Sequence, residues 1–192
     1  MRVTRALTIQ QPYAELLLPR QAGVRGSGPK RAENRTWFTR ELGLIAIHAG
    51  KGNGWMKRLA PWELRQLARS AGSGEAFDAL DYGAIVGVGL VDACVRYSPG
   101  VALSSLAPQH RWLRGHEHAT GPYCWTFAWT LRLPEPMPCR GYQQIWAIPD
   151  DVQDQLTDQL RSASMRAGVS PSSDGAGLFD SISTRQLEPA VA

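Results

Sequence analysis

Residues 30–51 read K-R-A-E-N-R-T-W-F-T-R-E-L-G-L-I-A-I-H-A-G-K, and this stretch decides both the expected fold and the expected site. Its first half places Glu33, Arg35 and Trp37 at alternate positions. Side chains two residues apart on a β-strand lie on the same face of the sheet. A carboxylate held between cations, with an indole beside it, suits a polar ligand such as a nucleobase better than it suits a hydrophobic core.

The second half of the stretch predicts the return strand of a β-hairpin. An apolar run over residues 42–49 follows four residues that suit a hairpin loop. A simple hairpin pairs Glu33 with Ala46 and Arg31 with His48. A slip of one residue would turn His48 to the other face, so the pairing of the histidine depends on the register.

The remaining pattern predicts many short strands and few helices. Further strands are expected over residues 3–9, 83–95, 123–133 and 145–148, and helices are expected to begin at Pro12, Pro61 and Pro149. This balance predicts an α+β, mainly β fold, built as a small, partly open β-barrel with helices packed around it. Residues 1–163 form the expected domain. Residues 164–192, rich in Ser, Gly, Asp and Ala, are expected to form a flexible C-terminal tail.

Two local patterns add expectations about packing. The helix that begins at Pro61 is expected to bury Trp62 against the core. The alternating strand that begins at Tyr123 is expected to end where Pro134 follows it, because proline cannot donate a hydrogen bond to a neighbouring strand.

The net charge of +4 conceals an asymmetry between the two parts of the chain. Residues 1–71 carry 13 Lys and Arg against 4 Asp and Glu, whereas residues 72–192 carry 8 against 13. A basic N-terminal part fits a phosphate-rich partner. An ordinary solvated surface of an arginine-rich protein explains the same charge equally well.

Cysteine usage and hydropathy limit the function classes. The three widely spaced cysteines form no C-x-x-C pair, so we expect reduced thiols, with neither a disulfide framework nor a zinc ribbon. The H-E-H segment at 116–118 lacks a cysteine partner at zinc spacing, and we expect no metal and no cofactor. No apolar run approaches the ~20 residues of a membrane span. A cytoplasmic protein without a membrane partner is therefore expected.

Five short motifs, taken in order, resemble those of the ASCH (activating signal cointegrator homology) domain. They are L-T-I-Q-Q-P-Y-A at 7–14, K-R-A-E-N-R-T-W at 30–37, H-A-G-K at 48–51, the glycine-containing strand at 83–94, and P-C-R-G…W at 138–146. The resemblance extends from about residue 5 to residue 150. It is closest to bacterial and phage-type members of the family.

The resemblance implies a PUA-like β-barrel, a fold shared with RNA-modification modules and readers of modified bases. Members of the family are associated with nucleic-acid binding, and a few are hydrolases. One branch removes the acetyl group of N4-acetylcytidine with a lysine followed three residues later by a threonine nucleophile. Lys30 matches that lysine, but Glu33 stands where the threonine would be. No motif identifies the further carboxylate of that branch, for which Glu117 is the nearest candidate.

The residues and the resemblance together predict a module that binds nucleic acid, RNA more readily than DNA, or a nucleotide. Cations would hold phosphate, Arg35 could also stack on a base, and Glu33 could accept a hydrogen bond from an exocyclic amine. Trp37 could be a stacking platform or part of the barrel core, and Glu33 and Arg35 could form an internal salt bridge. The predicted nucleic-acid-binding residues are Lys30, Arg35, Trp37, His48, Lys51, Gln11, Arg140 and Tyr123.

A second hypothesis is a small metal-independent hydrolase, either a ribonuclease or an amidohydrolase of an acylated nucleoside. Lys30 would activate the substrate, and Glu33 would act as a base through water. Two features favour binding over this catalysis. No Ser, Thr or Cys lies at the required spacing from Lys30, and flanking cations favour the ionised carboxylate of Glu33. A third hypothesis is a protein-interaction domain with a vestigial pocket.

Overall fold

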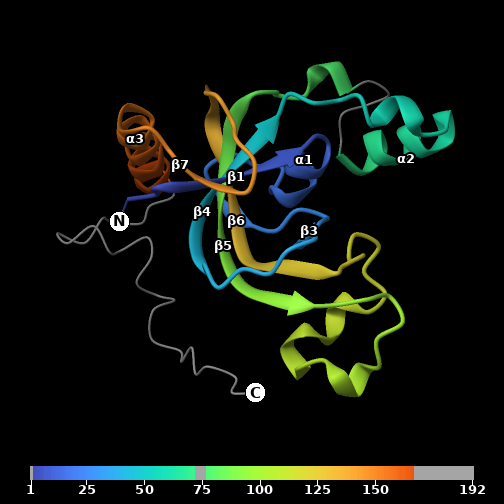
Figure 1. The fold of residues 1–192 in the computed structure, drawn as a ribbon. Helices are drawn as coiled ribbons and strands as arrows, with labels where there is room; N and C mark the ends of the chain where they lie inside the picture. Colours follow the sequence, from blue (N-terminus) through green and yellow to red (C-terminus); the bar gives the residue numbers. More distant parts are fainter. Residues whose placement is uncertain (1, 72–76, 167–192) are drawn as a thin grey trace.

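The computed structural model describes residues 2–71 and 77–166, which form one bent sheet with helices at its margins (Figure 1). The strands are β1 (Arg5–Gln10), β2 (Arg25–Gly26), β3 (Ala32–Arg35), β4 (Gly43–Gly50), β5 (Ala84–Arg96), β6 (Tyr123–Pro138) and β7 (Ile145–Ala147). The α-helices are α1 (Tyr13–Leu17), α2 (Pro61–Ala71) and α3 (Asp150–Arg166). Short 3₁₀ turns are η1 (Met56–Arg58), η2 (Phe77–Ala79), η3 (Leu103–Ser105) and η4 (Pro108–Leu113).

The seven strands lie in the order β2-β6-β5-β4-β1-β7, and β3 pairs with β6 off this path. β1 runs parallel to β4, whereas the other pairs are antiparallel. Within the described residues the sheet does not close on itself. The predicted α+β, mainly β fold, a partly open barrel with helices around it, is therefore confirmed.

The central strands are buried on both faces. One cluster of buried side chains joins β1, β4, β5 and β6 to α3, where Leu156 and Leu160 are at most 4% exposed. A second cluster joins the other face of β1 and β4 to α1 and to Trp125 of β6. β1 is thus held from both sides, which fixes the position of its C-terminal end, where the candidate site lies.

The C-terminal part of the chain follows the expected pattern up to the limit of the described residues. The helix expected after Pro149 is α3, which continues past the expected domain boundary to Arg166. The rest of the predicted tail, residues 167–192, lies outside the described residues. In the described part of the chain, no helix combines the length and the apolar character that crossing a bilayer requires.

The predicted hairpin is wrong. β3 pairs with β6, so that Glu33 lies opposite Trp125 instead of Ala46. β4 pairs with β1 and β5, and His48 lies opposite Thr8 instead of Arg31. Short-range loop length favoured the hairpin, but β6 offers β3 a longer buried partner strand.

Two packing expectations are also wrong. Trp62 is 60% exposed, and α2 buries Ala68 instead. β6 does not end at Pro134 but continues to Pro138. The pairing of β5 with β6 shifts register between Arg132 and Met137. Pro134 and Pro136 lie within this shift, where the strand can continue although proline has no N–H to donate.

Candidate functional site

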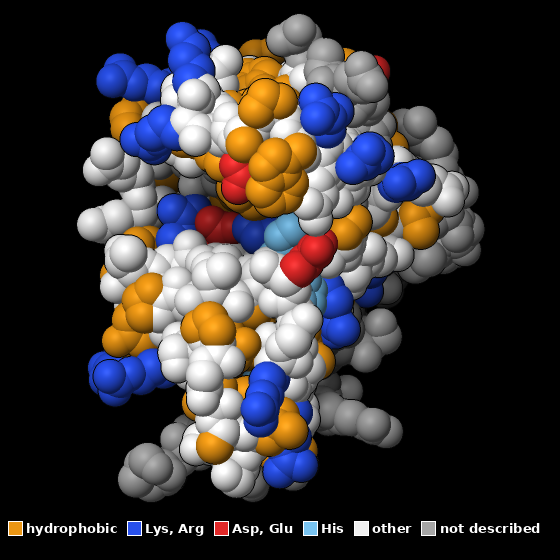
Figure 2. Space-filling model, turned by 90° about the vertical axis from the view of Figure 1, so that its right-hand side faces the viewer, with side chains coloured by type: hydrophobic (Ala, Val, Ile, Leu, Met, Phe, Trp, Pro, Cys, Tyr) orange, Lys and Arg blue, Asp and Glu red, His pale blue; other side chains and the backbone are white. Residues whose placement is uncertain are grey.

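A cleft of about 790 Å³ opens where β1, β3 and α1 meet two later segments of the chain. We call it the central cleft. Figure 2 shows a recess on this face in which acidic, basic and histidine side chains gather in a row. Its lining residues are Thr8, Ile9, Gln10, Tyr13, Lys30, Glu33, Asn34, Arg35, Trp37, Glu117, His118, Thr120, Gln143 and Gln144.

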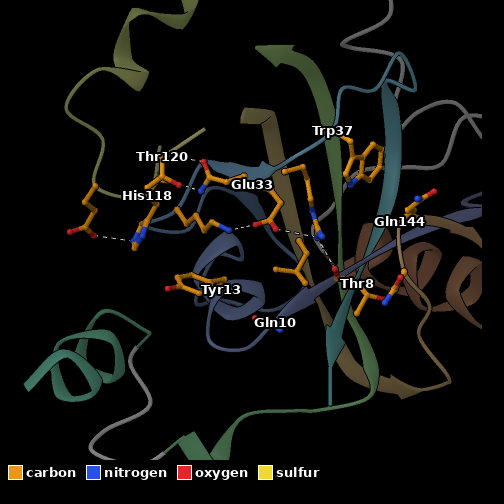
Figure 3. A pocket seen from close by; sticks show the side chains of 14 residues that line it. Thr8, Gln10, Tyr13, Glu33, Trp37, His118, Thr120 and Gln144 are labelled. Carbon is orange, nitrogen blue, oxygen red and sulfur yellow. Dashed lines mark hydrogen bonds and ion pairs between the residues drawn. The ribbon is translucent and has the colours of Figure 1, made fainter. Parts of the chain in front are cut away.

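A row of charged groups crosses the central cleft (Figure 3). The Lys30 ammonium contacts Glu33 Oε2, and Arg35 Nη2 lies 3.1 Å from Glu33 Oε1. The same Arg35 nitrogen donates a hydrogen bond of 2.7 Å to the carbonyl of Thr8. The side chains of Lys30 and Glu33 are 3% and 9% exposed, and that of Arg35 is 21% exposed. Each oxygen of the carboxylate therefore faces its own cation, and all three side chains are fixed in place.

Local structure explains why these side chains meet. The pairing of β3 with β6 turns Glu33 and Arg35 to one face. The backbone N–H of Lys30 donates to the carbonyl of Leu16, 2.9 Å away, which ties the start of this segment to α1. Burial lowers the pKa of Lys30, and the contact with Glu33 opposes that shift.

Tyr13, the first residue of α1, forms one wall of the cleft. The Lys30 ammonium lies 5.1 Å from the centre of its ring, and the indole of Trp55 stacks on the ring at 5.2 Å. Burial, and secondarily the charge of Glu33, raises the pKa of Tyr13, so its phenol keeps its proton at neutral pH. This wall is a flat aromatic surface with a cation beside it.

Asn34 brings the segment 117–121 to the cleft. Its side-chain amide donates to the carbonyl of His118 at 2.7 Å and accepts from the N–H of Thr120 at 2.9 Å and of Gly121 at 3.1 Å. His118 then lies edge-on to Tyr13, with its Nε2 at 3.0 Å from a carboxylate oxygen of Glu117. Burial lowers the pKa of His118 although Glu117 opposes the shift, so the ring is neutral at pH 7.

Trp37 forms the opposite wall. In Figure 3 it lies with Gln144 on the side of the cleft away from Tyr13 and His118. Its indole packs edge-on against Trp125 at 4.6 Å and also lines the cleft. The two interpretations of Trp37, core residue and stacking platform, are both compatible with this position.

The predicted site residues divide between the central cleft and a second one. Lys30, Arg35 and Trp37 line the central cleft. His48, Lys51 and Arg140 do not. They line a cleft of about 660 Å³, which we call the glycine-lined cleft, formed by Thr8, His48, Gly50, Lys51, Gly83, Pro138, Cys139, Arg140 and Gly141. The division follows from the pairing of β4 with β1, which carries His48 away from β3.

His48 connects β4 to the loop between β6 and β7. Its Nε2 lies 3.2 Å from the carbonyl oxygen of Cys139, and its ring packs edge-on against Trp146. Burial lowers the pKa of His48, the bond to Cys139 opposes the shift, and Lys51 adds to it. The neutral ring with its proton on Nε2 donates to Cys139 and holds the loop against the sheet.

Two of the predicted nucleic-acid-binding residues line neither cleft. Gln11 is fully buried: its amide donates to the carbonyl of Asp81 at 2.8 Å and accepts from the N–H of Glu15 at 3.1 Å, so it anchors α1. Tyr123 packs against the core cluster beside Trp125, with its ring edge-on to Phe38 at 5.9 Å. Gln11 is thus enclosed by the fold, whereas Tyr123 is only partly buried.

Tyr13, Asn34 and His118 line the central cleft but are not among the site residues predicted from the sequence. Tyr13 carried a signal, because it stands next to proline at the start of a short helix, inside one of the five motifs. Asn34 also lies inside one of the motifs, but no local pattern joins it to His118, because 84 residues separate the two. Within the described ranges, no group of three or more His, Cys, Asp or Glu side chains is arranged to hold a metal ion.

The chain matches no known protein-family model, and no curated protein matches it significantly.

Proposed function

We propose that the central cleft binds a nucleobase, presented by a single-stranded nucleic acid or by a nucleotide, with RNA favoured over DNA. The observation that carries this proposal is that two aromatic walls, Tyr13 and Trp37, and a fixed row of donors and acceptors share one open cleft. Aromatic side chains bind the faces of unstacked bases, and polar side chains bind their hydrogen-bonding edges.

The charged row supplies both kinds of hydrogen-bonding group. An ionised carboxylate has about four acceptor positions, and Glu33 uses one on each oxygen for Lys30 and Arg35. The remaining positions suit the exocyclic amine or ring N–H of a base. The ammonium of Lys30 and the guanidinium of Arg35 suit a base carbonyl.

The charge of the central cleft supports a base more than a phosphate. Lys30 and Arg35 are balanced by Glu33 and Glu117, and His118 is neutral because its pKa is lowered. A near-balanced cleft favours a polar, uncharged group. The preference for RNA rests on the resemblance to ASCH and PUA-like modules.

Fluorescence anisotropy with short labelled single- and double-stranded RNA and DNA, at low and moderate salt, tests the proposal. We expect single-stranded RNA to bind most tightly and to weaken as salt rises. Arg35→Gln should weaken binding, whereas Arg161→Gln, which removes a charge from α3 outside both clefts, should not. The proposal would be contradicted if none of the four nucleic acids bound, or if Arg35→Gln bound them as tightly as the wild type.

Hydrolysis of RNA or of an acylated nucleoside is the second candidate, because Lys30 is a buried cleft lysine with a lowered pKa. Against it, both oxygens of Glu33 already contact cations, which disfavours Glu33 as a base. Incubation of the protein with RNA and with N4-acetylcytidine, without added metal, tests this candidate by chromatography. Product that disappears in Lys30→Gln would favour it, and product formed equally by Glu33→Gln would remove Glu33 from the mechanism.

A further inference from the structure

The glycine-lined cleft differs from the central cleft in the sign of its charge. Its ionisable cations are Lys51 and Arg140, and none of its nine lining residues is acidic. Both cations are exposed at its rim. Clefts with one sign of charge concentrate oppositely charged ligands, so this one suits an anion.

Backbone geometry holds Lys51 in place. Gly83 has a φ of +67°, and a Cβ at this position would overlap the aliphatic part of the Lys51 side chain. The lysine stem therefore lies across bare backbone that only glycine supplies here. Arg140 is positioned by an aromatic ring instead, because its guanidinium lies 5.2 Å from the centre of the Tyr142 ring.

His48 and Gly141 hold the rest of the cleft wall. A Cβ on Gly141 would overlap the imidazole of His48, so the loop lies directly on the ring. His48 is 2% exposed, and its Nδ1 is buried with no hydrogen-bond partner among the described residues. A buried polar atom without a partner is unusual, and here it lies at the base of a cationic cleft. Protonation of Nδ1 would add a third positive charge next to a bound anion.

The two clefts are neighbours. Both are lined by Thr8, which accepts from Arg35 in the central cleft and lies opposite His48 on β4. The end of β6 and the loop that follows it also border both clefts, with residues 138–141 on one side and 143–144 on the other. A ligand that occupied both clefts would therefore pass Thr8.

We infer that the glycine-lined cleft is a phosphate subsite for the nucleotide whose base enters the central cleft. Lys51 and Arg140 contact the phosphate, and His48 is a positioning residue that holds the loop carrying Arg140. This inference rests on the proposed function and narrows the ligand to a phosphorylated nucleotide, free or within a strand.

The salt dependence of binding separates the two subsites. For a short single-stranded RNA, each lost phosphate contact should lower the slope of log affinity against log salt concentration by about 0.7. We expect that shift in Lys51→Gln and in Arg140→Gln. Trp37→Leu should weaken binding with the wild-type slope, because stacking releases no counterions. Arg161→Gln should leave both slope and affinity unchanged.

The outcomes distinguish the inference from the proposed function. Wild-type slopes in both Lys51→Gln and Arg140→Gln, with Trp37→Leu still weakened, would overturn the phosphate subsite and leave the base cleft standing. An equal slope change in Arg161→Gln would also overturn it, since the effect would then be general surface charge. Full affinity in Trp37→Leu, with reduced slopes in the two cation variants, would support the phosphate subsite but overturn the base cleft. Far-UV circular dichroism of each variant verifies that it is folded.

Discussion

The central cleft and the glycine-lined cleft share Thr8, but the row of charges in the first is largely buried and paired, whereas the charges of the second are exposed and only positive. In the central cleft, Lys30 and Glu33 are nearly buried and each has a partner of opposite sign. In the glycine-lined cleft, Lys51 and Arg140 are exposed and face no acidic side chain among the lining residues. Buried charges need their partners to be stable, whereas exposed charges are available to a ligand. Removing a charged side chain should therefore destabilise the fold in the central cleft but not in the glycine-lined cleft.

The largest expected effect tests that difference. Glu33→Ala leaves the buried ammonium of Lys30 without its counter-charge, and it should lower the free energy of unfolding by about 3–5 kcal/mol. Lys51→Ala, at an exposed position, should change the free energy of unfolding by less than about 0.5 kcal/mol. Urea denaturation followed by circular dichroism measures both. Equal, small changes in the two variants would show that the buried row does not stabilise the fold.

A smaller effect is expected where backbone lies on His48. Gly141→Ala places a methyl group against the imidazole and should destabilise the protein by about 1–3 kcal/mol. Gly52→Ala is the matched control, because a Cβ there would meet no atom within 4 Å. His48→Ala combined with Gly141→Ala should cost less than the sum of the single variants. Strict additivity would contradict the contact.

The stacking role of Trp37 should appear in affinity. Trp37→Leu should weaken binding of single-stranded RNA by about 1–3 kcal/mol, roughly 5- to 150-fold, in an anisotropy titration. Trp62→Leu serves as the control, since Trp62 is 60% exposed on α2 and lines neither cleft. Similar losses in both variants would indicate nonspecific contact with aromatic surface.

The smallest expected effect is a dependence of stability on pH. All four histidines of the chain have a lowered pKa in the fold, with burial as the main cause: His48, His110, His116 and His118. The unfolded chain therefore binds more protons once the pH drops below the ordinary histidine pKa of about 6.5, and the free energy of unfolding should fall from pH 7 toward pH 5.

Urea denaturation across this pH range measures the effect. His48→Gln removes one titrating group, so its free energy of unfolding should depend less on pH than that of the wild type. A wild-type protein that is equally stable or more stable at pH 5 would contradict the direction of these shifts.

Local patterns predicted part of the site. The alternation of Glu33, Arg35 and Trp37 placed all three on one cleft, because period two depends only on residues close in sequence. The overall balance of strands and helices also predicted the open, mainly β architecture, because each element is identified from residues close in sequence. The family resemblance added the strand-end motif at His48 and Lys51.

Long-range pairing could not be predicted in the same way. The hairpin between β3 and β4 was the simplest local solution, but β6, about 90 residues further along the chain, pairs with β3. Because β3 pairs with β6 and not with β4, His48 lies apart from Glu33, and the predicted site residues divide between two clefts. The fold also brings His118 to Tyr13 through the hydrogen bonds of Asn34, a contact for which no local spacing exists.

Photochemical cross-linking tests the central claim most directly. Single-stranded RNA that carries 4-thiouridine is irradiated with the protein, and the modified peptides are identified by mass spectrometry. Binding of a base between the two aromatic walls predicts cross-links on the peptides that contain Tyr13, Trp37 or His118, and their loss in Trp37→Leu. Cross-links confined to segments outside both clefts, such as α2 or α3, would contradict it.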